Sequence, residues 1–337
     1  MRRKRGGNGA LKSGDLPDGL LRTADEVSAE MSTAEVSAGR KHRKFRRSIP
    51  LLIMLVPVML YYIIFHFVPM FGLVMAFQDY KLNDGIQGSL FVGLRNFKYI
   101  FSVPSMLRII GNTLRIGLLS FVIGFPFPII LAILINEVKH IRFKKTVQTL
   151  VYLPHFLSWV AVGGIVMALF SQENGVINGI RNALGMEPIA FLYREGSWLA
   201  IFLGTGIWKE MGFSAIIYLA ALSGVDQTMY EAADLDGCPK WKQTFYISLP
   251  AIVPTIIVTL ILKAGSVVSV GFDQVYNLQN PAVNGIADVI STWVYRTGMK
   301  QMQFSISTAM GLFNSLLSLF LVTMTNSIAK KFDNSLW

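Results

Sequence analysis

The chain has 337 residues, of which 53% are hydrophobic and only 15% are charged. A soluble domain usually has about 25% charged residues, so this composition excludes an ordinary soluble fold and favours a membrane protein. The formal net charge of +11 would suit nucleic acid, but the basic residues gather beside apolar stretches, so we expect no nucleic-acid partner.

The first 47 residues are polar and have no sustained apolar face. Such segments bury too little apolar surface to fold, so we predict a disordered, basic N-terminal segment at 1–47. Its basic cluster, Arg40 to Arg47, directly precedes the first apolar run. Basic residues beside a span stay on the cytoplasmic side, so we expect the start of the chain there.

Six apolar runs follow, each near the length of about 20 residues that a helix needs to cross the hydrocarbon core. Their approximate limits are 49–74, 108–136, 147–170, 197–222, 251–273 and 305–328. We therefore predict an all-α membrane domain of six transmembrane helices at 48–330, followed by a tail at 331–337. Basic residues lie in the connections that alternation places inside, so both termini and the loop at 223–250 are predicted to be cytoplasmic.

Charged residues also fall within the spans. Lys209 and Glu210 lie near the middle of the fourth span, and Lys263 lies near the middle of the fifth. Ionisable groups at this depth are costly, and they are usually paired or face a cavity. Because the two spans run in opposite directions, we predict an interhelical ion pair between Glu210 and Lys263, with a structural role slightly favoured over a substrate role.

The loop at 223–250 is predicted to form two short helices. Asp226 is a good N-cap, Gly237 can take the left-handed conformation that ends a helix, and Pro239 suits the first position of the next one. Pro250 is expected to mark re-entry into the bilayer. The first helix is predicted to present a low face with acidic flanks, formed by Met229, Glu231, Ala232, Ala233 and Asp234.

In this loop, three residues separate Glu231-Ala232-Ala233 from Gly237, and nine further residues separate Gly237 from Ile247-Ser248-Leu249-Pro250. This spacing resembles the signature loop of binding-protein-dependent ABC importer permeases. The alternative is a solvated surface helix between two spans. In that family the loop docks a cytoplasmic ATPase, which implies as docking residues Met229, Glu231, Ala232, Ala233, Asp234, Gly237, Leu249 and Pro250.

Further motifs over roughly residues 45–337 resemble the carbohydrate-uptake branch of this family. They include Phe91 to Phe97, Asn112-Thr113, Tyr152-Leu153-Pro154 and Tyr218 to Leu222. Leu153 to Phe156, Asn280 to Val283 and Ser335-Leu336-Trp337 resemble a subgroup that handles oligosaccharides from polysaccharide breakdown. One departure is Gln227, where many relatives carry proline.

The resemblance implies a type I ABC importer permease bundle in a bacterial cell membrane. It implies a second, non-identical permease, two cytoplasmic ATPase subunits, an extracellular solute-binding protein and an oligosaccharide substrate. No G-x-x-x-x-G-K-[ST] sequence occurs in the chain, so a partner is expected to bind ATP and Mg, and this chain is expected to hold no cofactor and not to be an enzyme. The single cysteine, Cys238, and four dispersed histidines predict no metal site. An ion-coupled secondary transporter is the alternative function.

Polar and aromatic residues within the spans are candidates for the substrate path. Sugars are bound through hydrogen bonds to their hydroxyls and through aromatic faces against their rings. For Trp and Tyr near span ends, the alternative is the interfacial aromatic belt. The candidates are Asn112, Arg115, Trp159, Trp208, Tyr218, Asp273, Gln274 and Tyr276.

Overall fold

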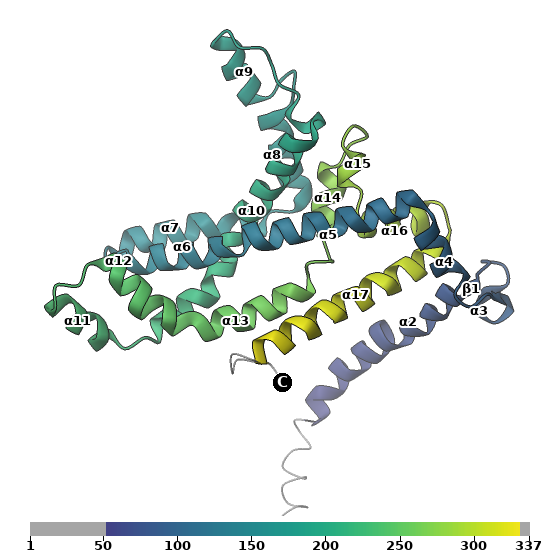
Figure 1. Ribbon diagram of the computed structural model, residues 1–337, viewed down its shortest axis with the longest axis horizontal. Coiled ribbons are helices and arrows are strands. Elements are labelled where there is room, and N and C mark those ends of the chain that lie inside the picture. The colour runs from purple at the N-terminus through teal and green to yellow at the C-terminus, as the bar shows by residue number, and fades with distance from the viewer. Residues whose placement is uncertain (1–51, 331–337) are drawn as a thin grey trace, which may run out of the picture. The chain divides into compact units, whose positions relative to one another are not determined.

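The computed structural model describes residues 52–330 (Figure 1). The predictions for 1–47 and 331–337 lie outside these residues. The chain divides into two units, Met1–Phe71 and Gly72–Trp337, which are described separately. Apart from the short antiparallel pair β1 (Gln78–Asp79) and β2 (Leu90–Phe91), the regular structure in the described range is helical, which confirms the predicted all-α class.

The described part of the first unit is helical and apolar. It belongs to the helix Leu52–Phe77, which continues through a π-helical turn, η1 (Ile63–Phe67), then α2 (Val68–Met70) and the tighter η2 (Phe71–Phe77). The side chains from Leu52 to Phe71 are exposed throughout. A helix that is apolar all round and has no buried face suits a lipid environment.

Four long apolar helices form the frame of the second unit. The first is Pro104–Glu137, made of α5 (Pro104–Gly124) and α6 (Pro126–Glu137). The others are α10 (Glu195–Ser223), Lys240–Gly265 and α17 (Phe304–Lys330). With Leu52–Phe77, the described residues thus contain five helices long and apolar enough to cross a membrane, and each of them overlaps one of the six predicted spans.

The predicted span 147–170 is not one straight helix. The segment Ile141–Phe156, made of α7 (Ile141–Tyr152) and η3 (Leu153–Phe156), is bent by 103° from α8 (Trp159–Phe170). Pro154 starts the tight turn, Leu157 is extended, and the Ser158 side chain accepts a hydrogen bond from the Ala161 amide to start α8. Counting the bent pair as one span gives six.

The predicted span 251–273 is displaced towards the N-terminus. The helix runs from Lys240 to Gly265 through α12 (Lys240–Gln243), the π-helical η5 (Thr244–Ser248) and α13 (Leu249–Gly265). Pro250 therefore lies inside a continuous helix and does not separate a cytoplasmic helix from a span. It is tolerated because it follows a π-helical turn, at the start of α13.

Shorter elements connect the long helices. Before α5 come α3 (Gly85–Gly88) and α4 (Arg95–Ser102), and before α10 come α9 (Val176–Ala183) and η4 (Phe191–Tyr193). The segment α11 (Gln227–Leu235) follows α10. Between α13 and α17 lie α14 (Phe272–Leu278), α15 (Asn284–Ala287), α16 (Ile290–Val294) and η6 (Tyr295–Lys300).

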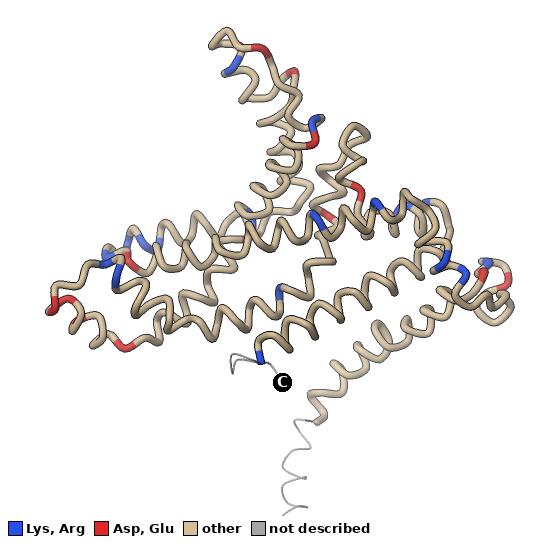
Figure 2. The backbone as a smooth tube through the Cα atoms, viewed as in Figure 1, with Lys and Arg blue, Asp and Glu red and all other residues tan. Residues whose placement is uncertain are grey.

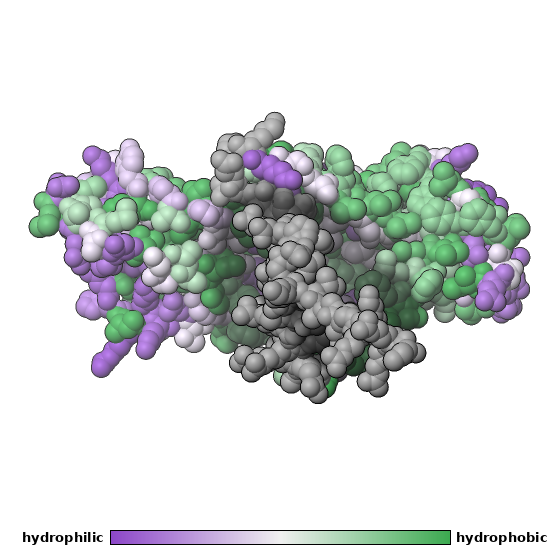
Figure 3. Space-filling view, turned by 90° about the horizontal axis from the view of Figure 1, so that it is seen from below, coloured by the Kyte–Doolittle hydropathy of each residue, from purple (hydrophilic) through white to green (hydrophobic). Residues whose placement is uncertain are grey.

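Three apolar clusters hold the second unit together. One joins α5, α8, α10 and α14 around Trp198 and Phe202. Another joins α4, α5, α16 and α17, and the third joins α6, α10 and α13 around Ile252. Charged residues gather near helix ends, leaving long uncharged stretches (Figure 2). Hydrophilic side chains are concentrated at the end that carries α11 and α12, at the left of Figure 3.

Candidate functional site

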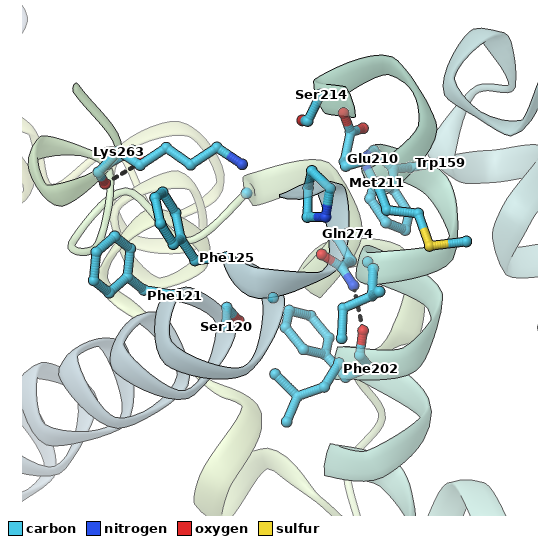
Figure 4. A pocket seen from close by; sticks show the side chains of 17 residues that line it. Ser120, Phe121, Phe125, Trp159, Phe202, Glu210, Met211, Ser214, Lys263 and Gln274 are labelled. Carbon is cyan, nitrogen blue, oxygen red and sulfur yellow. Dashed lines mark hydrogen bonds between the residues drawn. The ribbon is translucent and has the colours of Figure 1, made fainter. Parts of the chain in front are cut away.

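A cavity of about 300 Å³ opens between α5, α10, α13 and α14 (Figure 4). A second hollow of about 220 Å³ shares part of its wall, including Lys263 and Gln274. The walls combine aromatic rings with hydroxyl, amide and charged groups. The cavity-lining side chains labelled in Figure 4 are Ser120, Phe121, Phe125, Trp159, Phe202, Glu210, Met211, Ser214, Lys263 and Gln274.

The short helix α14 is fastened to α10 beside the cavity. The buried Gln274 side chain donates from Nε2 to the Phe202 carbonyl at 2.7 Å, and Trp198 Nε1 donates to the Leu278 carbonyl at 2.8 Å. Gly206 permits this approach, because a Cβ there would lie 3.1 Å from Gln274 Nε2. The amide of Gln274 is therefore held at the cavity wall by the packing of two helices.

A compact polar cluster joins the bend of the third span to α10. Lys209 is only 5% exposed, and its Nζ donates to the His155 carbonyl at 2.7 Å and lies 3.3 Å from Glu210 Oε1. His155 Nδ1 lies 2.9 Å from Glu210 Oε2. The His155 ring also stacks on Phe213 with centroids 4.0 Å apart. Glu210 thus has two partners, one of them supplied by the bend.

The predicted ion pair between Glu210 and Lys263 is wrong. Within residues 52–330 no ion pair within 4.0 Å joins these two side chains, although both line the same cavity. The reason is that His155 reaches Glu210 from the bend, where a straight span would not have placed it. Figure 4 shows Lys263 extending from the opposite wall, with its ammonium directed toward the cavity.

Of the predicted path residues, the structure brings Trp159 and Gln274 to the cavity. Asn112 instead donates to the carbonyls of Gly285 and Asp288, at 2.9 and 3.1 Å, and so holds the α15 segment against α5. Tyr218 is buried, with its hydroxyl 2.8 Å from Thr259 Oγ1, which joins α10 to α13. Both residues have structural contacts and neither lines the cavity.

The remaining candidates lie outside the cavity wall. Trp208 is 39% exposed and lines a separate apolar groove between α8 and α10. Arg115, Asp273 and Tyr276 are exposed. The cavity residues that the sequence analysis missed include Ser120, Phe121 and Phe125, and the GFPFP sequence that breaks the second span at this point was the available signal.

The two short helices predicted in the loop 223–250 are present at one end of the second unit as α11 and α12. We call α11, α12 and the turn between them the elbow. Asp226 caps α11 by accepting a hydrogen bond from the Thr228 amide at 3.0 Å, and this bond lowers the pKa of its carboxyl. Gly237 has φ of +67°, the left-handed conformation expected after a helix. Pro239 is the N-cap of α12, one position before the place predicted for it.

The elbow is locked by a network around Gln243, which is only 1% exposed. Its Nε2 donates to Asp234 Oδ1 at 2.6 Å and to the Cys238 carbonyl at 2.9 Å. Lys240 Nζ lies 3.0 Å from Asp234 Oδ1. The hydrogen bond from Gln243, and then that from Lys240, lower the pKa of Asp234. Asp234 therefore faces its own elbow, although its sequence position suggested a docking contact.

The outward face of the elbow is polar and apolar in patches. Met229, Glu231 and Ala232 are exposed, as predicted for a docking face. Leu249 instead packs against the cluster of α6, α10 and α13. Four further large side chains on α11, α12 and η5, which the sequence analysis did not single out, are also exposed, namely Leu235, Trp241, Phe245 and Tyr246. The described residues contain no group of three or more His, Cys, Asp or Glu side chains that could hold a metal.

A bundle of long apolar helices around a polar cavity, with a hydrophilic elbow at one end, defines a membrane transport subunit. Residues 124–336 match the family described as "Binding-protein-dependent transport system inner membrane component", and the chain belongs to this family. This confirms the family assigned from the signature loop and identifies a multi-pass bacterial membrane protein.

The relatives include carbohydrate permeases. The chain is 42% identical over 315 residues to the polygalacturonan/rhamnogalacturonan transport system permease protein YteP of Bacillus subtilis, covering 90% of this chain and 98% of the relative. It is 29% identical over 277 residues to the arabinooligosaccharides transport system permease protein AraP of Halalkalibacterium halodurans, covering 81% of this chain and 85% of the relative.

A solved structure shares the fold. It is the crystal structure of a bacterial ABC transporter involved in the import of the acidic polysaccharide alginate. One of its chains matches with a TM-score of 0.79 and 38% identity over 87% of this chain and 99% of that chain. The predicted type I importer permease fold and the carbohydrate-uptake branch are thereby confirmed.

Proposed function

We propose that this chain is one of two homologous permease subunits of an ATP-driven importer for oligosaccharides released from polysaccharides. The cavity between α5, α10, α13 and α14 is the part of the saccharide path that this chain supplies. A solute-binding protein delivers the substrate, in keeping with a related transporter that was crystallised with an alginate pentasaccharide-bound periplasmic protein.

The observation that carries the proposal is the exposed face of α11 on a locked elbow. Met229, Glu231 and Ala232 project outward, while Gln243 holds the turn behind them. A face of this kind can bind a partner that has a groove with basic residues. Because the turn is held rigid, α11 and α12 move together when the partner moves. The continuous helix Lys240–Gly265 then carries the movement from the elbow to Lys263 in the cavity wall.

ATP and Mg are bound by two ATPase subunits that dock on this elbow and on its counterpart in the second permease. Closing of the ATPase pair moves both elbows together, and the two permeases rock about the cavity between outward and inward openings. This arrangement requires α11, α12 and both termini to be cytoplasmic. The basic residues of α12, Lys240 and Lys242, agree with that orientation.

The test is saccharide uptake by proteoliposomes that contain the complete transporter, with ATP supplied on the ATPase side. Glu231→Arg reverses the charge of the docking face and is expected to abolish ATP-dependent uptake while the subunit still inserts. Glu173→Arg, at an exposed glutamate between α8 and α9, is the matched control and should transport normally. Undiminished uptake by Glu231→Arg would refute docking at α11, and uptake driven by an ion gradient without ATP would indicate a secondary transporter.

A further inference from the structure

We propose that the Lys263 ammonium binds a carboxylate of the translocated saccharide, so that the cavity favours oligosaccharides containing uronic acids over neutral ones. The inference rests on the proposed function, because it takes the cavity to be part of the saccharide path. It adds to the proposed function a class of ligand, oligosaccharides that contain uronic acids, and the residue that would distinguish them from neutral saccharides, Lys263.

The first observation is that Lys263 has no partner for its charge. Within the described chain no side chain forms a hydrogen bond or an ion pair with its Nζ. The side chain is half-buried in the last turn of α13, at the cavity end of the helix Lys240–Gly265, and so not in the middle of the span where the sequence had placed it. Ionisable groups on membrane helices are normally paired or face a water-filled path. An unpaired lysine that points into a cavity is therefore placed to receive an anion from outside the chain.

The second observation is the charge of the cavity. Glu210 and Lys263 are the charged residues in its wall. Glu210 is held by Lys209 at 3.3 Å and by His155 at 2.9 Å, so its negative charge is already opposed. Glu210 attracts Lys263 across the cavity but forms no ion pair with it within 4.0 Å. Because Lys209 and Lys263 together outnumber the single carboxylate of Glu210, the cavity presents a net positive field to an entering ligand. Such a field attracts acidic sugars and offers nothing comparable to neutral ones.

The third observation is the position of Lys263 between two hollows. Both the 300 Å³ cavity and the 220 Å³ hollow are lined by Lys263, Ser266 and Gln274. A saccharide that extends from one hollow to the other must pass the ammonium. The rings of Phe121 and Trp159 supply apolar faces for sugar rings. The ligand that satisfies all these groups has pyranose rings, hydroxyls and a carboxylate.

Binding to the complete solubilised transporter without its solute-binding protein tests the inference, because the permeases are then the saccharide-binding subunits. The probes are trigalacturonate and its trimethyl ester, which differ in charge and share the same rings. We expect trigalacturonate to bind about 10- to 100-fold more tightly than the ester, the range expected for a hydrogen bond to a charged group. Lys263→Met should abolish this preference, and Lys263→Arg should retain it.

The matched control is Lys98→Met, which removes the same charge from an exposed position on α4, away from the cavity. It should leave the preference unchanged. A wild type without preference, or a Lys263→Met variant that keeps it, would overturn the inference. Equal losses for both probes in Lys263→Met would also overturn it, and would indicate that Lys263 pairs with an acidic residue of the second permease.

Uptake by wild-type proteoliposomes separates failure of this inference from failure of the proposed function. ATP-dependent uptake of a neutral oligosaccharide such as arabinotriose, with no preference for trigalacturonate over its ester, would refute the role of Lys263 alone. The absence of uptake for every saccharide, from a fully assembled transporter with its solute-binding protein, would refute the proposed function.

Discussion

Replacing Gly212 by alanine is expected to push α7 away from α10. A Cβ built at Gly212 would lie 2.5 Å from the carbonyl carbon of Val151 and closer still to its oxygen. Non-bonded carbons pack at about 3.5–4.0 Å, so the backbone of α7 must retreat by about 1 Å. The obstacle is backbone, which cannot rotate out of the way as a side chain would.

The structure indicates the size of this effect. Overpacking of this kind costs about 1–3 kcal/mol, while alanine in a helix is about 1 kcal/mol better than glycine. A retreat of about 1 Å also takes the Lys209–His155 and His155–Glu210 contacts, now 2.7 and 2.9 Å, beyond hydrogen-bonding range. Hydrogen bonds to charged groups contribute about 1.5–3 kcal/mol when buried, and Glu210 is partly exposed, so we expect a total loss of about 2–4 kcal/mol.

Thermal unfolding of the detergent-solubilised protein, followed by circular dichroism, measures this loss. The matched control is Gly204→Ala on the same helix, where a Cβ would meet no atom within 4 Å. Gly204→Ala should unfold at or above the wild-type temperature, whereas Gly212→Ala should unfold about 5 °C or more below it. Equal unfolding temperatures for the two variants would refute the close approach of α7 and α10.

Two further predictions concern residues that the structure reassigned. Tyr218→Phe removes the 2.8 Å contact with Thr259, so it should lower the free energy of unfolding by about 1 kcal/mol and leave saccharide uptake unchanged. If the variant altered uptake of one saccharide and not of others, Tyr218 would be a substrate-path residue after all. For Asp234, the lowered pKa means that the carboxylate stabilises the elbow fully above its ordinary value of 3.8 and that this contribution is lost as the pH falls below it. Trp241 fluorescence during an acid titration should therefore show a transition that is absent in Asp234→Asn, and an unchanged titration in that variant would exclude Asp234 as its source.

Much of the membrane frame could be predicted from hydropathy, because a span must be apolar over a length fixed by the bilayer. The ends of the fifth helix could not be predicted from hydropathy, because this helix begins at Lys240 and its first residues are polar, so a hydropathy window excludes them. The break in the third span was also missed. Hydropathy averages over Leu153 to Ser158, yet Pro154 and the cap at Ser158 carried the local signal for a break.

The elbow was predicted more accurately than the cavity, and the reason is physical. Its turn depends on local chemistry, so Asp226 and Gly237 could be assigned from their neighbours in the sequence. Cavity residues depend on the rotation of each helix about its axis. Tyr218 and Gln274 are both polar residues in apolar surroundings, yet Tyr218 points into a core cluster and Gln274 lines the cavity wall. Sequence spacing within one helix does not decide which face meets the cavity.

The break in the third span also determines the charge of the cavity. If Ile141–Phe170 were one straight helix, His155 would lie farther from Glu210. The cations near Glu210 would then be Lys209 on its own helix and Lys263 on the opposite wall of the cavity. The 103° bend instead brings His155 to 2.9 Å from Glu210, and its carbonyl receives Lys209. Because Glu210 is satisfied on its own side, Lys263 keeps its charge available. A backbone irregularity in one span thus sets the electrostatic selectivity that we propose for the residues of another.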